Sequence, residues 1–361
     1  MGPIPTTLRR IRIFVASPGD VQDERAQLGR VVQELNQILT TLVPEAGLVL
    51  ELVRWETHVH PGLGADAQDV VTRQLQIDEY DVFVGVFWRR FGTPTARAES
   101  GTEEEFRIAH HAWKELGRPI QIMTYFCRAL APPPEDSEAG AQLQKVVKFR
   151  EELFKEGLAR DYGEHAEFAD SVRNDLVLVL GQMLHAKSSP SAIAAQADHA
   201  STDDDRGAVR ERIRVLAHEY DSMRAPITGM LPGAERTRKM EVVASKMRGL
   251  ALSAHPFLSE LIQSQSAGER LAAVSTLEAI PEVTYLPWLA ERLGSEKPFV
   301  GYHAALGLLS AARSLDVEDL PSVQTAVDVA RRGIRRKRSD ADRETVLGYT
   351  EDELLRRRAQ S

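Results

Sequence analysis

Arginines, aromatic rings and small turn residues follow three short apolar runs of this sequence. Together they could bind a ligand that carries a ring and a negative charge, because arginine pairs with anionic oxygens and tryptophan offers a flat apolar face. Parallel strands would bring these residues to one edge of a sheet, where the ligands of such folds bind. The candidate binding residues are Ser17, Pro18, Gly19, Asp20, Trp55, Trp88, Arg89 and Arg90.

A simpler interpretation of the first group is a turn between a strand and a helix. In Ser17–Asp20 the proline presets its φ, Gly19 permits a positive φ, and Asp20 can cap the helix that follows. Turn chemistry alone would account for this tetrapeptide. Its position beside the other candidate residues is what makes it one wall of a proposed pocket.

An acidic helix start, "TEEE" at residues 102–105, follows the third apolar run. Its spacing fits a capping box in which Thr102 is the cap and Glu105 lies three residues on, and acidic residues there also favour the helix dipole. Glu105 is therefore either a structural capping residue or a carboxylate that serves the pocket.

The first 186 residues alternate between strand and helix patterns. Short β-branched and aromatic runs at residues 11–16, 48–55, 81–88 and 118–126, with a shorter one near 156–163, are separated by stretches with helical spacing of apolar residues. Residues 129–156 interrupt the alternation as an insertion that contains a charged helix. The pattern predicts a flavodoxin-like α/β domain with a parallel sheet over residues 1–186.

Residues 187–207 are rich in Ser, Ala and Asp and poor in large apolar side chains, which predicts a flexible linker. Residues 208–361 show only helical patterns. Prolines 256, 287 and 321 stand 31 and 34 residues apart at the heads of similar segments, which predicts stacked helix pairs resembling short HEAT-type repeats. The alternative is an irregular helical bundle with coincidental prolines.

Composition places the chain among ordinary globular proteins, with 43% hydrophobic and 27% charged residues and a net charge of -8. A single cysteine, Cys127, and the lack of a long apolar run favour a cytoplasmic protein with no membrane segment. We expect no metal, because the His58/His60 and His110/His111 pairs lack further ligands. The basic runs at residues 331–338 and 356–358 are expected to be solvated helix faces, so nucleic-acid binding is not favoured.

Two segments together resemble a known family. "IRIFVASPGDVQDER" and "DVFVGVFWRRFGTPTARAESGTEEEF" are similar to a bacterial family of uncharacterised domains that is marked by an S-P-G-D-V turn and grouped with the TIR-like domains. The resemblance covers approximately residues 9–185. It implies a TIR-like version of the flavodoxin-like fold.

TIR domains either assemble signalling complexes or cleave NAD to release nicotinamide, and the catalytic ones carry a glutamate on the helix after the third strand. The resemblance gives that role to Glu105, which is followed by Phe106 and, four residues on, by Ala109. A carboxylate there can stabilise an oxocarbenium-like transition state. NAD would then be a substrate, with no bound cofactor.

Two hypotheses about function follow from the resemblance. The first is an NAD or nucleotide glycohydrolase effector, of the kind found in bacterial antiviral defence, that oligomerises on activation and responds to a protein trigger through the helical domain. The second is a non-catalytic TIR-like adaptor that only docks other proteins.

Overall fold

The computed structural model of the chain describes residues 8–41, 47–54, 67–157, 159–185, 203–225, 228–335 and 341–360. The chain divides into two compact units. One comprises Thr7–Gln37 and Gly47–Val172, and the other is built mainly from Arg173–Ser361. Most of the predicted linker lies outside the described residues, and its last five residues, 203–207, belong to a helix.

A parallel sheet of five strands forms the centre of the first unit. The strand order is β2-β1-β3-β4-β5, and every neighbouring pair is parallel. This is the order of flavodoxin-like folds, so the predicted α/β class is confirmed. The strands are β1 (Arg9–Ala16), β2 (Leu48–Val53), β3 (Val82–Phe87), β4 (Gln121–Cys127) and β5 (Ala159–Tyr162).

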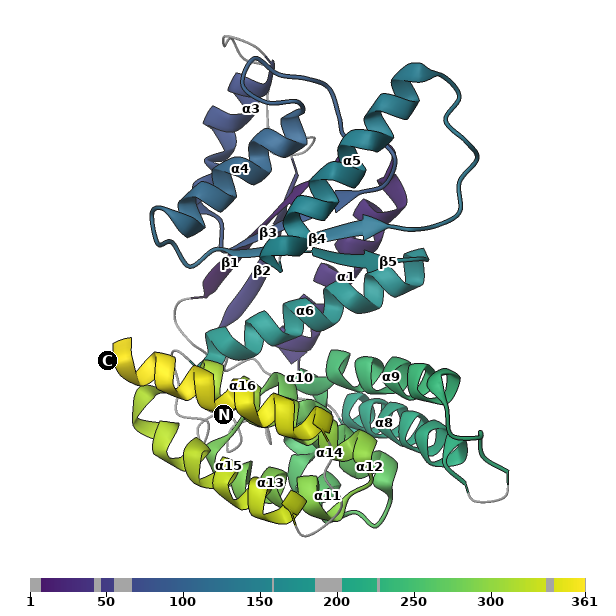
Figure 1. Ribbon diagram of the computed structural model, residues 1–361, viewed down its shortest axis with the longest axis vertical. Coiled ribbons are helices and arrows are strands. Elements are labelled where there is room, and N and C mark those ends of the chain that lie inside the picture. The colour runs from purple at the N-terminus through teal and green to yellow at the C-terminus, as the bar shows by residue number, and fades with distance from the viewer. Residues whose placement is uncertain are drawn as a thin grey trace. The chain divides into compact units, whose positions relative to one another are not determined.

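Helices cover both faces of this sheet (Figure 1). On one face, Phe14, Phe83 and Phe126 share a buried core with Phe106 and Phe149 from the covering helices. The six residues of β3 are all buried, as a central strand covered on two sides requires. The helices of this unit are α1 (Gln22–Thr41), α3 (Ala67–Leu75), the 3₁₀ turn η2 (Ile77–Glu79), α4 (Gly101–Lys114), α5 (Ser137–Glu156) and α6 (His165–His185).

Among the described residues, the region after α6 contains helices and no strand, as the sequence predicts. Its α-helices are α8 (Asp203–Met223), α9 (Ala234–Gly249), α10 (Ala251–Ala254), α11 (Leu258–Gln263), α12 (Ala267–Ala279), α13 (Leu286–Ser295), α14 (Pro298–Ser314), α15 (Leu320–Arg335) and α16 (Ala341–Gln360). Three 3₁₀ turns stand between them: η4 (His255–Phe257), η5 (Val283–Tyr285) and η6 (Val317–Asp319).

The last helices stack as repeated pairs. Each first helix of a pair, α11, α13 or α15, follows a 3₁₀ turn, and its partner packs beside it. Helix α13 packs against α15, and α14 packs against both α12 and α16 (Figure 1). Of the three prolines that predicted the repeat, Pro287 and Pro321 lie in the first turns of α13 and α15, and Pro256 lies in η4, directly before α11. One hydrophobic core runs through all of the pairs.

Within the described part of the chain, no helix is both long enough and apolar enough to span a membrane.

Candidate functional site

A cavity of about 380 Å³ lies at the carboxyl ends of β1 and β3. Four of the predicted binding residues line it: Asp20 from the turn after β1, and Trp88, Arg89 and Arg90 from the turn after β3. Neither arginine has a carboxylate partner among the described residues, although Arg89 donates a long bond of 3.4 Å to the Pro133 carbonyl. The cavity is therefore able to accept an anionic group.

Asp20 joins the two turns that form this cavity. Its Oδ2 accepts hydrogen bonds from the backbone amides of Arg89 and Arg90, each at 2.9 Å. Its other oxygen, Oδ1, is buried and has no hydrogen-bond partner in the described structure. The expectation that Asp20 caps the following helix is thus wrong, because its carboxylate is turned toward the neighbouring loop.

The rest of the Ser17–Asp20 turn is held from within the domain. Arg25, only 7% exposed, donates from Nε to the Ser17 hydroxyl at 2.6 Å, and its Nη2 bonds the carbonyls of Ser17 and Pro18. The Ser17 hydroxyl is therefore engaged in supporting the turn. Gly19 is exposed but does not adopt a positive φ, so the expected use of its conformational freedom is wrong.

Helix α5, which the sequence marked only as part of an insertion, forms another wall of the cavity. Its residue Gln142 accepts from the backbone amides of Phe91 and Gly92 at 2.7 and 3.0 Å and donates to the Gly92 carbonyl at 3.2 Å. Asp136 caps the same helix through the amide of Ala139. Glu135, Asp136 and Glu138 bring negative charge to this side of the cavity, opposite in sign to the arginines.

Glu105 lies on α4 and does not line this cavity. Its side chain is 6% exposed, and Oε1 accepts a hydrogen bond of 3.0 Å from Gln68 of α3. The cap of α4 is Ser100, whose hydroxyl accepts from the Glu103 amide at 3.0 Å. The capping box with Thr102 and Glu105 is therefore wrong, and the burial of Glu105 has another reason than capping.

The two glutamates before Glu105 are also buried and are engaged with arginines. Glu103 pairs with Arg107 at 2.5 Å, and Glu104 is bonded to Arg97. The second oxygen of Glu104 has no hydrogen-bond partner within the described ranges. The start of α4 thus holds three buried carboxylates. The sequence explained these acidic residues only by the preference of helix N-termini for negative charge and did not predict their burial.

Some predicted site residues cannot be placed. Trp55 and the His58/His60 pair lie outside the described residues. His110 is described and pairs with Glu156 at 3.0 Å. In the described ranges no group of three or more His, Cys, Asp or Glu residues is arranged to hold a metal ion.

A second polar cluster of the α/β unit involves Glu24, which is 3% exposed. Glu24 Oε1 accepts from the Tyr162 hydroxyl at 2.9 Å and lies 3.1 Å from His165 Nδ1. Burial raises the pKa of Tyr162, and the charge of Glu24 adds to the rise. Burial also raises the pKa of the nearby Cys127 thiol, so this cysteine is not an activated nucleophile.

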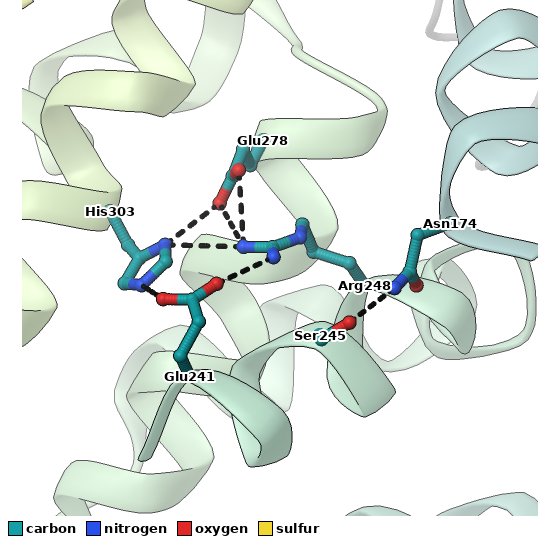
Figure 2. A network of polar contacts seen from close by, with 6 residues as sticks. All are labelled: Asn174, Glu241, Ser245, Arg248, Glu278 and His303. Atoms are coloured by element: carbon teal, nitrogen blue, oxygen red, sulfur yellow. Dashed lines mark hydrogen bonds and ion pairs between the residues drawn. The ribbon is translucent and has the colours of Figure 1, made fainter. Parts of the chain in front are cut away.

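The helical unit contains a buried ionic network that the sequence did not reveal (Figure 2). His303 is 1% exposed and lies between two carboxylates, 3.1 Å from Glu241 through Nε2 and 3.1 Å from Glu278 through Nδ1. Arg248 binds the same two glutamates, at 2.8 and 3.2 Å. Three helices, α9, α12 and α14, are joined by these contacts.

The charges of this network set the protonation of its members. Burial lowers the pKa of His303, but hydrogen bonds to Glu241 and Glu278 and their charges outweigh it and raise the pKa to about 9. Burial likewise opposes ionisation of Glu241, yet the bond to His303 and the charges of His303 and Arg248 lower its pKa to about 2. Near neutral pH the network therefore holds two cations against two anions.

The basic runs near the C-terminus are engaged in internal contacts where they are described. Arg331 pairs with Glu351 at 2.6 Å, and Arg356 pairs with Glu353 at 2.5 Å. Arg357 donates to the carbonyls of Ala312 and Leu315 at 2.9 and 2.6 Å. Arg331 and Arg357 thus join neighbouring helices, whereas Arg356 pairs within α16.

Comparison with known families gives one result for the α/β unit. Residues 12–177 match the family described as a domain of unknown function, DUF4062. The match spans β1 to the middle of α6, so an uncharacterised α/β family domain followed by a helical region is confirmed. No curated protein and no solved structure matches the chain.

Proposed function

We propose that the α/β domain is a TIR-like hydrolase that cleaves the N-glycosidic bond of NAD or a related nucleotide. The observation that carries this proposal is the cavity at the ends of β1 and β3, the first and third strands, where the strand order changes direction. Ligands of flavodoxin-like folds bind at that point. Arg89 and Arg90 would bind the phosphates, and Trp88 would contact a ring.

Glu105 is the carboxylate that the proposal assigns to catalysis. It would stabilise positive charge on the ribose as the bond to nicotinamide breaks, and water would then add to the same carbon. The products are nicotinamide, ADP-ribose and one proton, so the reaction needs no further reactant. Capping does not account for Glu105, since Ser100 caps α4.

The proposal also explains why the resting protein would be slow. Glu105 is nearly buried and is bonded to Gln68 of α3, so a substrate in the cavity cannot reach it without a rearrangement. We assign that rearrangement to self-assembly or to a protein trigger acting through the helical region. A role in bacterial antiviral defence belongs to the same proposal.

A test is nicotinamide release from NAD by the purified full chain, measured alone and after assembly is induced by crowding. Glu105→Gln is expected to reduce the assembled rate by about 100-fold or more, because the amide cannot stabilise the cation. Glu103→Gln is the matched control, since it changes a neighbouring buried carboxylate and leaves Glu105 in place. Equal rates for the two variants would contradict the proposal.

One observation favours a second candidate, a non-catalytic adaptor. Glu105 lies outside the cavity that Asp20, Trp88, Arg89 and Arg90 line, so the domain could bind a ligand or partner without cleaving it. In that case Glu105→Gln would leave the biological effect intact, while substitution of both arginines would abolish it. A mass-spectrometric search for consumed nucleotides separates the two candidates.

A further inference from the structure

A second cavity, of about 650 Å³, lies within the helical unit. Its volume is in the range of sites that hold drug-sized ligands. Helices α8, α9, α14 and α16 form its walls, and none of the residues predicted from the sequence belongs to it. The lining combines two arginines, three aromatic rings and two carboxylates: Arg224, Arg236, Phe299, Tyr302, Tyr349, Glu241 and Asp342.

The arginines of this cavity are not neutralised by neighbouring carboxylates. Arg224 donates to the Tyr220 hydroxyl and Arg236 to the Met230 carbonyl, each at 3.2 Å, and neither has an ion-pair partner in the described structure. The Nε of Arg236 is buried and lacks a hydrogen-bond partner there. The buried Nε–H of Arg236 is thus a hydrogen-bond donor that an anionic oxygen in the cavity would satisfy.

Helix ends add to the positive character of the cavity. Helices α9 and α14 both begin at it, and their N-cap residues, Gly233 and Lys297, provide no side-chain cap. Such ends carry partial positive charge, and α14 offers backbone N–H groups after Pro298, whereas Glu235 in the first turn of α9 offsets part of the charge at that end. Glu241 does not cancel this charge, because it is already paired with Arg248 and His303.

The remaining lining residues can bind a planar ring and a sugar. Phe299, Tyr302 and Tyr349 provide faces against which a planar base can stack. Tyr349 is 58% exposed, so its ring is available to a ligand. Asp342 is exposed at the start of α16, and its carboxylate can accept hydrogen bonds from the hydroxyl groups of a ribose.

From these features we propose that the cavity between α8, α9, α14 and α16 is a second ligand site, which binds a nucleoside phosphate. The arginines and the two helix ends hold the phosphate, the aromatic side chains hold the base, and Asp342 holds the sugar. The site is independent of the proposed hydrolase, and it gives the helical unit a small-molecule ligand to sense.

The site is also connected to the buried network of the helical unit. Glu241 lines the cavity and bonds to His303, and Phe299 packs against the His303 ring with 4.7 Å between the ring centres. A ligand that touches Phe299 or Glu241 therefore contacts residues that join α9, α12 and α14. Occupation of the site is expected to stabilise the helical unit as a whole.

The test uses the full chain and two fluorescent probes, ATP and GTP labelled through a linker on the exocyclic amine of the base, so that the ribose hydroxyls stay free to bind Asp342. At least one probe should bind with a Kd of about 100 µM or tighter. The unlabelled nucleotide should displace it at least about ten-fold better than either its nucleoside or inorganic phosphate, because each of these lacks half of the contacts.

Variants locate the binding. Arg236→Ala and Tyr349→Ala should each weaken it by about ten-fold, and Arg238→Ala, an exposed position on the same helix outside the cavity, should leave it unchanged. Tyr349 is exposed, so its substitution tests the site even if Arg236→Ala misfolds. With Arg89 and Arg90 both changed to alanine, the binding that depends on Arg236 and Tyr349 should remain, because the first two arginines line the other cavity.

Three results would overturn the inference. They are no binding of either probe at about 1 mM, binding by the Arg236 and Tyr349 variants that is as tight as by the original protein, and loss of binding only when Arg89 and Arg90 are changed. The last result would place the nucleotide in the α/β domain and would support the proposed hydrolase instead. Failure of nicotinamide release, in turn, leaves this second site unaffected.

Discussion

Arg25 holds Ser17: the guanidinium of Arg25, on the first turns of α1, donates to the Ser17 hydroxyl at 2.6 Å and also binds the Ser17 carbonyl. The strand and the helix that follows it are thus tied together directly behind the turn that they share. Arg25 satisfies the Ser17 hydroxyl and the carbonyls of Ser17 and Pro18, so the shape of this part of the wall does not depend on a ligand.

We expect Arg25→Ala to destabilise the α/β domain by roughly 3 kcal/mol, because two buried carbonyls and a hydroxyl lose their donor. Arg25→Lys should recover only part of this, since an ammonium group cannot reproduce the fork of the guanidinium. Urea unfolding followed by circular dichroism measures both values. Unchanged stability of the alanine variant would show that water replaces the arginine.

Asp20→Ala should separate the two turns that form the first cavity. The amides of Arg89 and Arg90 lose their acceptor, at a cost of about 2 kcal/mol, whereas Asp20→Asn keeps an oxygen in place and should cost less. Amide hydrogen exchange at residues 89 and 90 reports the change directly. If exchange there is as slow in the alanine variant as in the original protein, Asp20 does not hold the loop.

Ser100→Ala tests which residue caps α4. Loss of the bond to the Glu103 amide should lower the unfolding free energy by about 1 kcal/mol, the usual effect of removing such a cap. Thr102→Val, which removes the hydroxyl but keeps the shape of the side chain, serves as the comparison at the residue that the sequence favoured. Thermal unfolding of both variants decides between the two assignments.

The protonated form of His303 should make the stability of the helical unit depend on pH. Since folding raises the pKa from 6.5 to about 9, the stabilisation is complete below pH 6.5 and is lost as the pH rises through 9. The full effect is roughly 3 kcal/mol. The groups facing the imidazole are Glu241, Glu278, Arg248 and the rings of Phe299 and Tyr302.

Unfolding free energies measured from below pH 6.5 to above pH 9 test this dependence. The His303→Gln variant should have a lower unfolding free energy than the original protein at the acid end of this range. Its unfolding free energy should also fall much less as the pH rises. A decline of the same size in the variant would mean that other groups are responsible.

The sheet was predictable because its signals are local. A buried parallel strand needs a nearly continuous apolar run, as in residues 81–88, and each run is followed by a helical pattern. The same logic placed Asp20, Trp88, Arg89 and Arg90 together, since the ends of neighbouring parallel strands meet at one edge. The repeat of the helical region was also predictable, because each helix pair carries its own proline and the three prolines recur at similar spacing along the chain.

The contacts that decide the roles of individual residues were not predictable. Ser100 and Thr102 are both good caps, and only the backbone at Ser100 shows where α4 begins. Asp20 accepts from amides that lie about seventy positions away along the chain, a pairing that turn statistics cannot supply. His303 meets carboxylates from two other helices, and nothing in the sequence around it distinguishes it from a surface histidine.

The bond from Asp20 to the residues after β3 uses backbone amides, and this has a consequence for how the cavity can change during evolution. Any residue except proline offers the same amide, so positions 89 and 90 can exchange their side chains while the two loops stay joined. Asp20 and the two backbone amides set the geometry of the cavity, whereas the side chains at positions 89 and 90 set its ligand preference, so the two properties can change independently. Relatives with the aspartate but with other residues in place of the arginines would keep the same pocket for a different ligand.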